Sequence, residues 1–366
     1  MIAKVSFLLC LAGVGFVAGG EIILRVFYFG PDALFHFRRY EPVVTVKPWH
    51  LVLSDNPRIA VEPRPDYQWC YLGKQVKSNR LGIVDDRVRI EKKEGSQTIV
   101  MMGESYMEGS GVDLSERVTA LLESKLRRHG DYSVVNMALT NTVLESQIER
   151  LKTQVIPHYH PDVVLIAFIA GGNITGSVLP QAVWKQRIET GPDHYPLWKI
   201  SFFLFMLHDY AENFQLTPDW FMKKGMKFFG AGNKSGQALA AQKAASVEAS
   251  AGTPDFVRVR ALFSELAELG EKNHFQTVIV PVSLMKDLQN PNRSAYWRGL
   301  SKSMADEFHF PYIDTVLFFK GQDVRACILW AMNRHPNAYA NRIFADGIYQ
   351  GLLSQKILLD HKANSN

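Results

Sequence analysis

The sequence predicts an α/β fold, a three-layer α/β/α sandwich around a central, mainly parallel sheet. From residue 98 onward, short β-favouring apolar runs alternate with amphipathic stretches of helical period. The run 163–169 is aliphatic or aromatic throughout, which is typical of a strand buried on both faces. With 366 residues, 47% of them apolar, the chain can bury the core of one large domain with additional segments.

The first segment, residues 1–29, is expected to be a signal-anchor transmembrane helix. An apolar run over 5–18 is followed by two glycines, Glu21 and a second apolar run interrupted by Arg25. A cleaved signal peptide is the alternative, but no small-x-small cleavage site follows the run. The expected location is therefore the inner membrane, in a single pass, with the main domain in the periplasm or outside the cell.

Residues 30–95 are rich in proline and aromatic side chains, with short alternating runs such as 43–46. This composition indicates a stalk with a few edge strands. Residues 96–366 then form the main domain.

The main domain begins with two strand-helix pairs and a third strand. The expected elements are a strand at 98–102, a helix at 115–129, a strand at 134–137, a helix at 144–156 closed by Pro157, and the strand at 163–169.

The alternation stops over residues 176–253, which we expect to be an insertion. Its first half carries tryptophans and the apolar run 200–207, and its second half is rich in Gly, Ala and Ser. We expect a helical, aromatic flap that shapes the substrate entrance. An ordinary helical excursion filling a groove is the alternative.

Regular structure is expected to return after the insertion. It consists of a helix at 256–272, a strand at 277–282, a helix at 295–308, a short strand at 312–316 and a last helix at 338–359, preceded by Pro336 and Asn337.

Charge and cysteine content exclude several classes of function. The net charge of +5 is spread along the chain without a basic block, so no nucleic acid partner is expected. The three cysteines form no C-x-x-C pair and no metal-ligand cluster, so we expect neither a metal nor a cofactor. Cys70 and Cys327 would either pair or remain as two thiols.

Candidate site residues lie where the predicted strands end and where the last helix begins. Ser105 follows the first strand, Ala138 follows the second, Asn173 follows the third, and His335 precedes the last helix. The carboxyl edge of a parallel sheet is where ligands bind, so a nucleophile, a base and hydrogen-bond donors would meet there. Taken alone, Ser105 would more often be a helix-capping serine.

The blocks G-E-S-Y-M-E-G-S-G-V (residues 103–112), P-D…N (161–173) and H-P-N-A (335–338) resemble those of the SGNH (GDSL-like) hydrolases, membrane-anchored bacterial type. The N-R-L-G stretch at 79–82 is similar to a block of anchored members. Glu104 stands where that family usually has aspartate.

The resemblance implies roles for individual residues. Ser105 would be the nucleophile and His335 its base, with Ser105, Ala138 and Asn173 forming the oxyanion hole. Asn333 stands where the family places an aspartate, so it would take the orienting role in place of the acid. Asp323 is a second candidate for that role.

The resemblance also implies a function. We expect a serine esterase or O-acyltransferase that acts on acyl esters, above all acetyl esters, of a carbohydrate or lipid. A membrane acyltransferase is a further expected partner. The alternatives are a catalytically weakened subunit for glycan binding or complex assembly, and a lipase or thioesterase with an acyl groove lined by 200–207.

Overall fold

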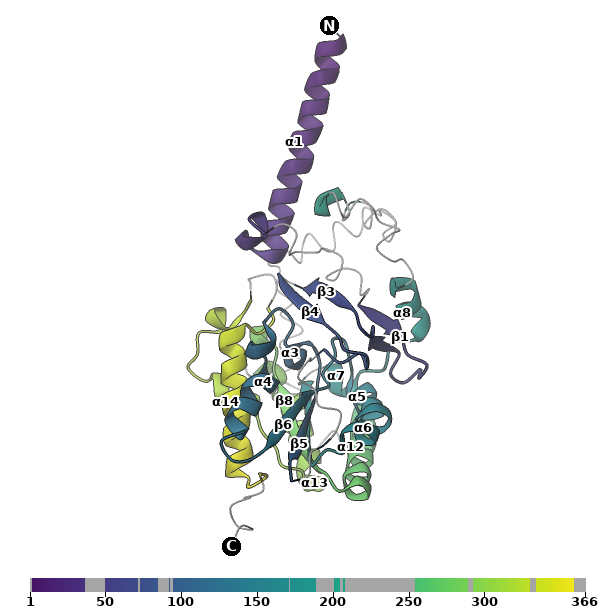
Figure 1. The fold of residues 1–366 in the computed structure, drawn as a ribbon, viewed down its shortest axis with the longest axis vertical. Coiled ribbons are helices and arrows are strands. Elements are labelled where there is room, and N and C mark those ends of the chain that lie inside the picture. The colour runs from purple at the N-terminus through teal and green to yellow at the C-terminus, as the bar shows by residue number, and fades with distance from the viewer. Residues whose placement is uncertain are drawn as a thin grey trace.

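The computed structural model describes residues 2–36, 50–71, 73–84, 92, 95–170, 172–188, 201–204, 207, 254–288, 292–329 and 334–358. A long N-terminal helix projects from a compact body in which helices flank a sheet (Figure 1).

The body is built on four parallel strands in the order β6-β5-β7-β8 within the described part of the chain. Their bounds are Gln97–Met102 for β5, Tyr132–Asn136 for β6, Val163–Ile169 for β7 and Gln276–Val282 for β8. The predicted fold class is confirmed, since the sheet is parallel and helices cover both of its faces (Figure 1).

Successive side chains of β5 point to opposite faces and bury against different helices. Ile99 and Met101 pack in one core, whereas Val100 and Met102 pack in the other. The first core is covered by α4 (Val118–Leu126) and α14 (Ala338–Ser354). The second is covered by α5 (Leu144–Arg150), α12 (Pro254–Asn273) and α13 (Asn292–Glu307).

The helix predicted to end at Pro157 continues past it, so that boundary is wrong. After α5 the chain makes one π-helical turn over Leu151–Val155 and then forms α6 (Ile156–Tyr159), with Pro157 in its first turn. The amide of Ile156 bonds to the carbonyl of Leu151, five residues back. Because the turn shifts the bonding register just before the proline, Pro157 sits where a missing N–H is tolerated.

The strand predicted at 312–316 is also wrong. Tyr312 makes a single parallel bridge to Ile279, and the chain then turns into a 3-10 helix, η9 (Thr315–Phe319). Asp314 explains the turn, because its side chain accepts the amide proton of Val316 and caps η9.

The N-terminal part consists of α1 (Ile2–Phe29), a 3-10 turn η1 (Pro31–Leu34) and two antiparallel hairpins. The hairpins pair β1 (Leu51–Leu53) with β2 (Val61–Pro63), and β3 (Gln68–Tyr71) with β4 (Lys74–Lys77). The run 43–46 lies outside the described residues. Among the described residues, α1 is the one helix long and apolar enough to cross a membrane, a property that a signal sequence shares.

Two pieces of the insertion are described. Helix α8 (Gln181–Ile188) packs Trp184 against Leu51 and Leu139, and residues 201–204 pack against α1. The rest of 189–253, except residue 207, lies outside the described residues. Cys327 is a buried free thiol, so it forms no disulfide with Cys70.

Candidate active site

The candidate nucleophile lies in a sharp turn between β5 and a one-turn helix, α3 (Ser105–Glu108). Gly103 makes this turn possible, because a Cβ there would come within 2.8 Å of the Cβ of Met107. Ser105 occupies the first position of α3, and Gly109, with φ of 79°, ends the helix in the left-handed region. The serine is thereby presented at the carboxyl edge of the sheet.

The candidate base lies in the segment that enters α14. The carbonyl of His335 accepts the amide proton of Leu329 at 2.9 Å, and the amide of Asn337 donates to the carbonyl of Cys327 at 3.0 Å. Asn337 also caps α14, since its Oδ1 accepts the amide proton of Ala340 at 3.0 Å. The backbone around His335 is therefore held on both sides.

These two elements bring the predicted nucleophile and base into contact. The Nε2 atom of His335 lies 3.0 Å from Oγ of Ser105, although the residues are 230 positions apart. This distance is within the reach needed for proton transfer from a serine to an imidazole. Asn333, the predicted orienting residue, lies outside the described residues.

Burial keeps the imidazole neutral. It lowers the pKa of His335 to about 4, because the charged form loses its hydration. A neutral ring whose Nε2 faces the serine hydroxyl accepts a hydrogen bond there when its proton is on Nδ1. The resting site therefore holds an unprotonated base beside the hydroxyl at neutral pH.

Tyr106, the residue after the nucleophile, connects it to the base. The Tyr106 hydroxyl donates to the carbonyl of Arg334 at 3.0 Å and accepts the amide proton of Met285 at 3.2 Å. Its ring meets that of His335 edge-on, with centroids 5.3 Å apart. Burial raises the pKa of Tyr106 to about 12, so the phenol keeps the proton that it donates.

The predicted oxyanion donors lie at the ends of the neighbouring strands. The amide of Ala138 donates to Oδ1 of Asn136 at 3.1 Å, so a substrate oxygen would have to share or displace this bond. Asn173 belongs to the short helix α7 (Gly172–Thr175) that follows β7, and its side chain lies outside the described atoms. The amide of Ser105 begins α3, at the end where helical N–H groups point outward.

Asn136 is a residue of the site to which the sequence assigned no role. Besides accepting from Ala138, it donates through Nδ2 to the carbonyl of Met107 at 3.0 Å. It thus fixes the end of β6 against α3, and its place at the end of a strand was the signal available in the sequence.

A buried polar layer behind α3 supports the loop that carries Ala138. The carboxylate of Glu108 accepts the amide proton of Thr140 at 3.0 Å and also the Thr140 hydroxyl proton. Burial raises the pKa of Glu108. Arg150 donates to the carbonyl of Met137 at 2.7 Å, while burial lowers its pKa to about 10. Both groups pin the loop after β6 by hydrogen bonds to its backbone.

Two other blocks of the sequence have structural roles. Asn79 closes the N-R-L-G turn, because its Oδ1 accepts amide protons from Leu81 at 2.9 Å and Ile83 at 3.0 Å. Asp162 joins β5 to β7 at the opposite edge of the sheet, where its carboxylate accepts the amide proton of Thr98 at 2.7 Å.

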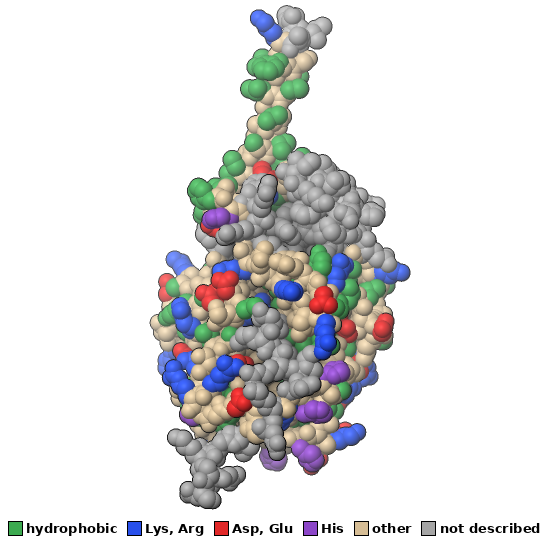
Figure 2. Space-filling model, viewed as in Figure 1, with side chains coloured by type: hydrophobic (Ala, Val, Ile, Leu, Met, Phe, Trp, Pro, Cys, Tyr) green, Lys and Arg blue, Asp and Glu red, His purple; other side chains and the backbone are tan. Residues whose placement is uncertain are grey.

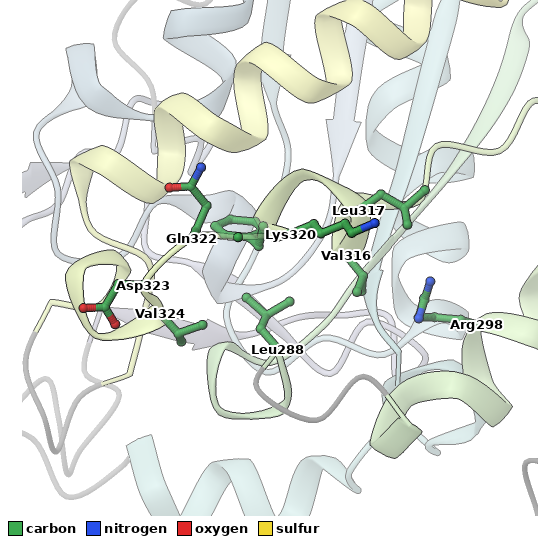
Figure 3. A pocket seen from close by; sticks show the side chains of 10 residues that line it. Leu288, Arg298, Val316, Leu317, Lys320, Gln322, Asp323 and Val324 are labelled. Carbon is green, nitrogen blue, oxygen red and sulfur yellow. The ribbon is translucent and has the colours of Figure 1, made fainter.

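The residues that line a pocket of about 560 Å³ include neither Ser105 nor His335 (Figure 3). Leu288, Val316 and Lys320 are among its lining residues, together with Asp323. Asp323 caps the 3-10 helix η10 (Val324–Cys327), since its side chain accepts the amide proton of Arg325. This capping bond uses Oδ1 of the carboxylate that is the second candidate for orienting His335.

No group of three His, Cys, Asp or Glu side chains among the described residues could hold a metal ion. The arrangement that the structure does provide is a hydroxyl, a neutral imidazole and backbone amides at one edge of the sheet, which is the set of groups used in acyl transfer.

No family model and no curated protein matches this chain. Among solved structures, TesA matches with 13% identity and a TM-score of 0.41, covering 70% of this chain and 98% of TesA. The psychrotrophic esterase EstA from Pseudoalteromonas sp. matches with 12% identity and a TM-score of 0.42, covering 72% of this chain and 100% of EstA. The acetyl xylan esterase AlAXEase matches with 12% identity and a TM-score of 0.40, covering 70% of this chain and 99% of the esterase.

At these identities and TM-scores the matches assign no role to any residue of this chain. The SGNH likeness of the sequence blocks therefore remains a resemblance, and the chemistry depends on this chain's own contact between Ser105 and His335.

Proposed function

We propose that this protein is a serine esterase or O-acyltransferase of SGNH type that acts on acyl esters, above all acetyl esters, of a carbohydrate or lipid. The observation that supports this most directly is the 3.0 Å separation between Nε2 of His335 and Oγ of Ser105. Burial that keeps His335 unprotonated adds to it, because a base must be free to take the serine proton.

The geometry suits a two-step reaction. Oγ of Ser105 attacks the acyl carbon while its proton passes to Nε2 of His335, and the tetrahedral oxyanion accepts hydrogen bonds from backbone amides at the strand ends. His335 returns the proton to the departing alcohol oxygen as the ester C–O bond breaks, which leaves an acyl-Ser105. A water or a sugar hydroxyl then attacks that acyl group, with His335 again taking the proton.

The experiment uses a fluorophosphonate probe and an aryl acetate on the full chain. We expect labelling at Ser105 that is lost in Ser105→Ala and reduced at least about 100-fold in rate in His335→Ala. Ser354→Ala and His129→Ala are matched controls, since Ser354 and His129 are exposed and bond elsewhere. Labelling that survives Ser105→Ala would contradict the assignment.

A catalytically weakened subunit for glycan binding or complex assembly is the second candidate. The bond between the Ala138 amide and Asn136 favours it, because that bond occupies a predicted oxyanion donor. Complete absence of labelling and turnover by the folded chain, with retained binding of an acetylated glycan, would support this candidate.

Two expectations remain proposals: a membrane acyltransferase as partner, which comes from the sequence resemblance, and the periplasmic side of the inner membrane as location, which comes from the apolar N-terminal segment. Transfer and hydrolysis are separated by supplying a glycan acceptor with the aryl acetate. Transfer gives an acetylated glycan, whereas hydrolysis gives acetate only.

A further inference from the structure

The C-terminal part of α1 packs against a segment of the insertion that lies some 180 residues later in the chain. Both oxygens of Glu21 are used there: Oε1 accepts from Nε of Arg25 at 2.5 Å, and Oε2 accepts from Oγ of Ser201 at 2.7 Å and the amide of Phe203 at 2.8 Å. Glu21 and Arg25 are only 9% and 2% exposed. A carboxylate so enclosed needs these partners, because an unpaired buried charge is costly.

The apolar side chains around this polar group fit together closely. The ring of Phe203 meets that of Phe16 edge-on with centroids 5.3 Å apart, and Phe202 packs against Phe29 at 5.3 Å. The ring of Phe203 lies against Gly20 of α1. A Cβ at position 20 would come within 2.6 Å of this ring, so the contact requires glycine. The helix surface is therefore shaped for this segment.

The opposite side of the same helical turns is apolar and exposed. Ile22 and Ile23 are 52% and 68% exposed beside the buried Glu21 and Arg25. Figure 2 shows apolar side chains along most of the projecting helix, below a Lys or Arg side chain near its tip, whereas acidic and basic side chains are mixed on the body. The apolar stretch Lys4–Phe27 has 24 residues and a length of about 36 Å, enough to cross a hydrocarbon core of about 30 Å.

We propose that Glu21, Arg25, Ser201 and Phe203 form an anchor clamp, which keeps α1 in the mature protein and seats the folded body on a lipid bilayer. The lipid covers the exposed apolar face of α1 as far as Ile23, and residues 201–204 lie at the bilayer boundary. The pair of charges at the end of the span is then satisfied by the protein, as ionisable groups within a membrane require. This inference is independent of the chemistry proposed for Ser105.

The clamp has a consequence for the orientation of the body. In Figure 1 the helix α3, which follows β5, lies at the end of the sheet that faces α1, with the β3/β4 hairpin between them. With α1 in this position across a bilayer, the carboxyl edge of the sheet would face the membrane.

The test measures hydrogen exchange of residues 201–204 in the full chain, reconstituted in phosphatidylethanolamine and phosphatidylglycerol nanodiscs. We expect Glu21→Ala to speed exchange of the Phe203 amide about tenfold or more, because its buried acceptor is lost. Asp32→Asn is the matched control, since Asp32 forms an exposed pair with His36 just beyond α1, and it should leave the rate unchanged.

Two further variants keep the test decisive if Glu21→Ala misfolds because Arg25 loses its ion pair with Glu21. Ser201→Ala removes one partner and no charge, and the double variant Glu21→Ala with Arg25→Ala removes both charges; each should also speed exchange of Phe203. Fluorophosphonate labelling of Ser105 should stay the same in all these variants, which separates this inference from the proposed reaction. If the hydrogen-exchange rate of residues 201–204 is the same in all these variants as in the wild type, the clamp is overturned. An intact mass showing cleavage within α1 would overturn it as well.

Discussion

Replacing Tyr106 by phenylalanine tests whether the rate depends on how His335 is positioned, because His335 itself remains in the variant. The change removes the hydroxyl that donates to Arg334 and accepts from Met285, and keeps the ring that lies edge-on to His335. We expect the segment carrying His335 to lose its tie to α3, while Ser105 and the imidazole both remain.

The size of the effect follows from these two hydrogen bonds. Met285 is fully buried, so its amide would be left without this acceptor, and such a loss costs about 1–3 kcal/mol of unfolding free energy. A displacement of about 1 Å in a catalytic group can cost on the order of 100-fold in rate. We therefore expect kcat to fall about 10- to 100-fold in Tyr106→Phe. KM should change little, since the buried hydroxyl is enclosed by the protein.

The assay measures aryl acetate turnover and the rate of fluorophosphonate labelling well below the melting temperature of each variant, and a separate thermal unfolding scan determines that temperature. Tyr159→Phe is the matched control. Tyr159 is also buried with a pKa raised to about 12, but its hydroxyl has no hydrogen-bond partner among the described residues. That variant should match the wild type in rate.

Tyr106→Phe turning over at the wild-type rate would refute the reasoning. A fall in activity no larger than the fraction of unfolded protein would refute it too, because the tyrosine would then be structural only.

The pH dependence of kcat/KM should reflect a base with a pKa of about 4: activity stays level as pH falls from 8 to 5 and reaches half near pH 4, where an ordinary histidine would fail near 6.5. Because the folded pKa of His335 is below its unfolded value, the unfolded chain binds the proton better, and urea unfolding should show stability falling between pH 6.5 and 4. Gly103→Ala should lower the unfolding free energy by about 1–3 kcal/mol through overcrowding in the turn before Ser105; an unchanged urea midpoint would contradict this. Gly82→Ala should destabilise more than Gly95→Ala, since both have positive φ but only Gly82 would bring a Cβ within 2.6 Å of a backbone carbonyl; equal urea midpoints would contradict the difference.

The strands of the sheet were predictable because their apolar residue pattern is by itself sufficient to identify a buried strand. In β7 every side chain is buried, and an unbroken apolar run is what such a strand requires. That residues 312–316 form no strand could not be predicted in this way. Tyr312 and Ile313 have strand-like sequence, but Asp314 bonds to Arg298 and caps η9, and these contacts arise only in the folded chain. The same holds for Pro157. A proline usually ends a helix, but here the preceding π-helical turn shifts the hydrogen-bond register and the helix continues.

The candidate nucleophile and base could be named from the sequence because Ser105 and His335 stand in blocks that resemble those of one family, at the end of a strand and at the start of a helix. The hydrogen bonds that hold these two residues in place could not be predicted from the sequence. Tyr106 bonds to residues 228 and 179 positions away, and no local pattern in the sequence announces such partners. The occupied amide of Ala138 is a similar case, since its acceptor on Asn136 depends on how the chain turns after β6.

The low pKa of His335 decides how this site could work. Burial disfavours an imidazolium, so the resting base stays unprotonated, and taking up a proton is energetically unfavourable. In acyl transfer that proton arrives together with a negative charge on the acyl oxygen a few ångströms away. The oxyanion can then act as the counter-charge that a triad carboxylate supplies elsewhere. The rate should for this reason depend more steeply on the oxyanion donors than on Asn333, so Asn136→Ala, which frees the Ala138 amide but loosens its loop, should change kcat more than Asn333→Ala does. Equal effects of the two substitutions on kcat would contradict this, because Asn333 would then stabilise the imidazolium as much as the oxyanion does.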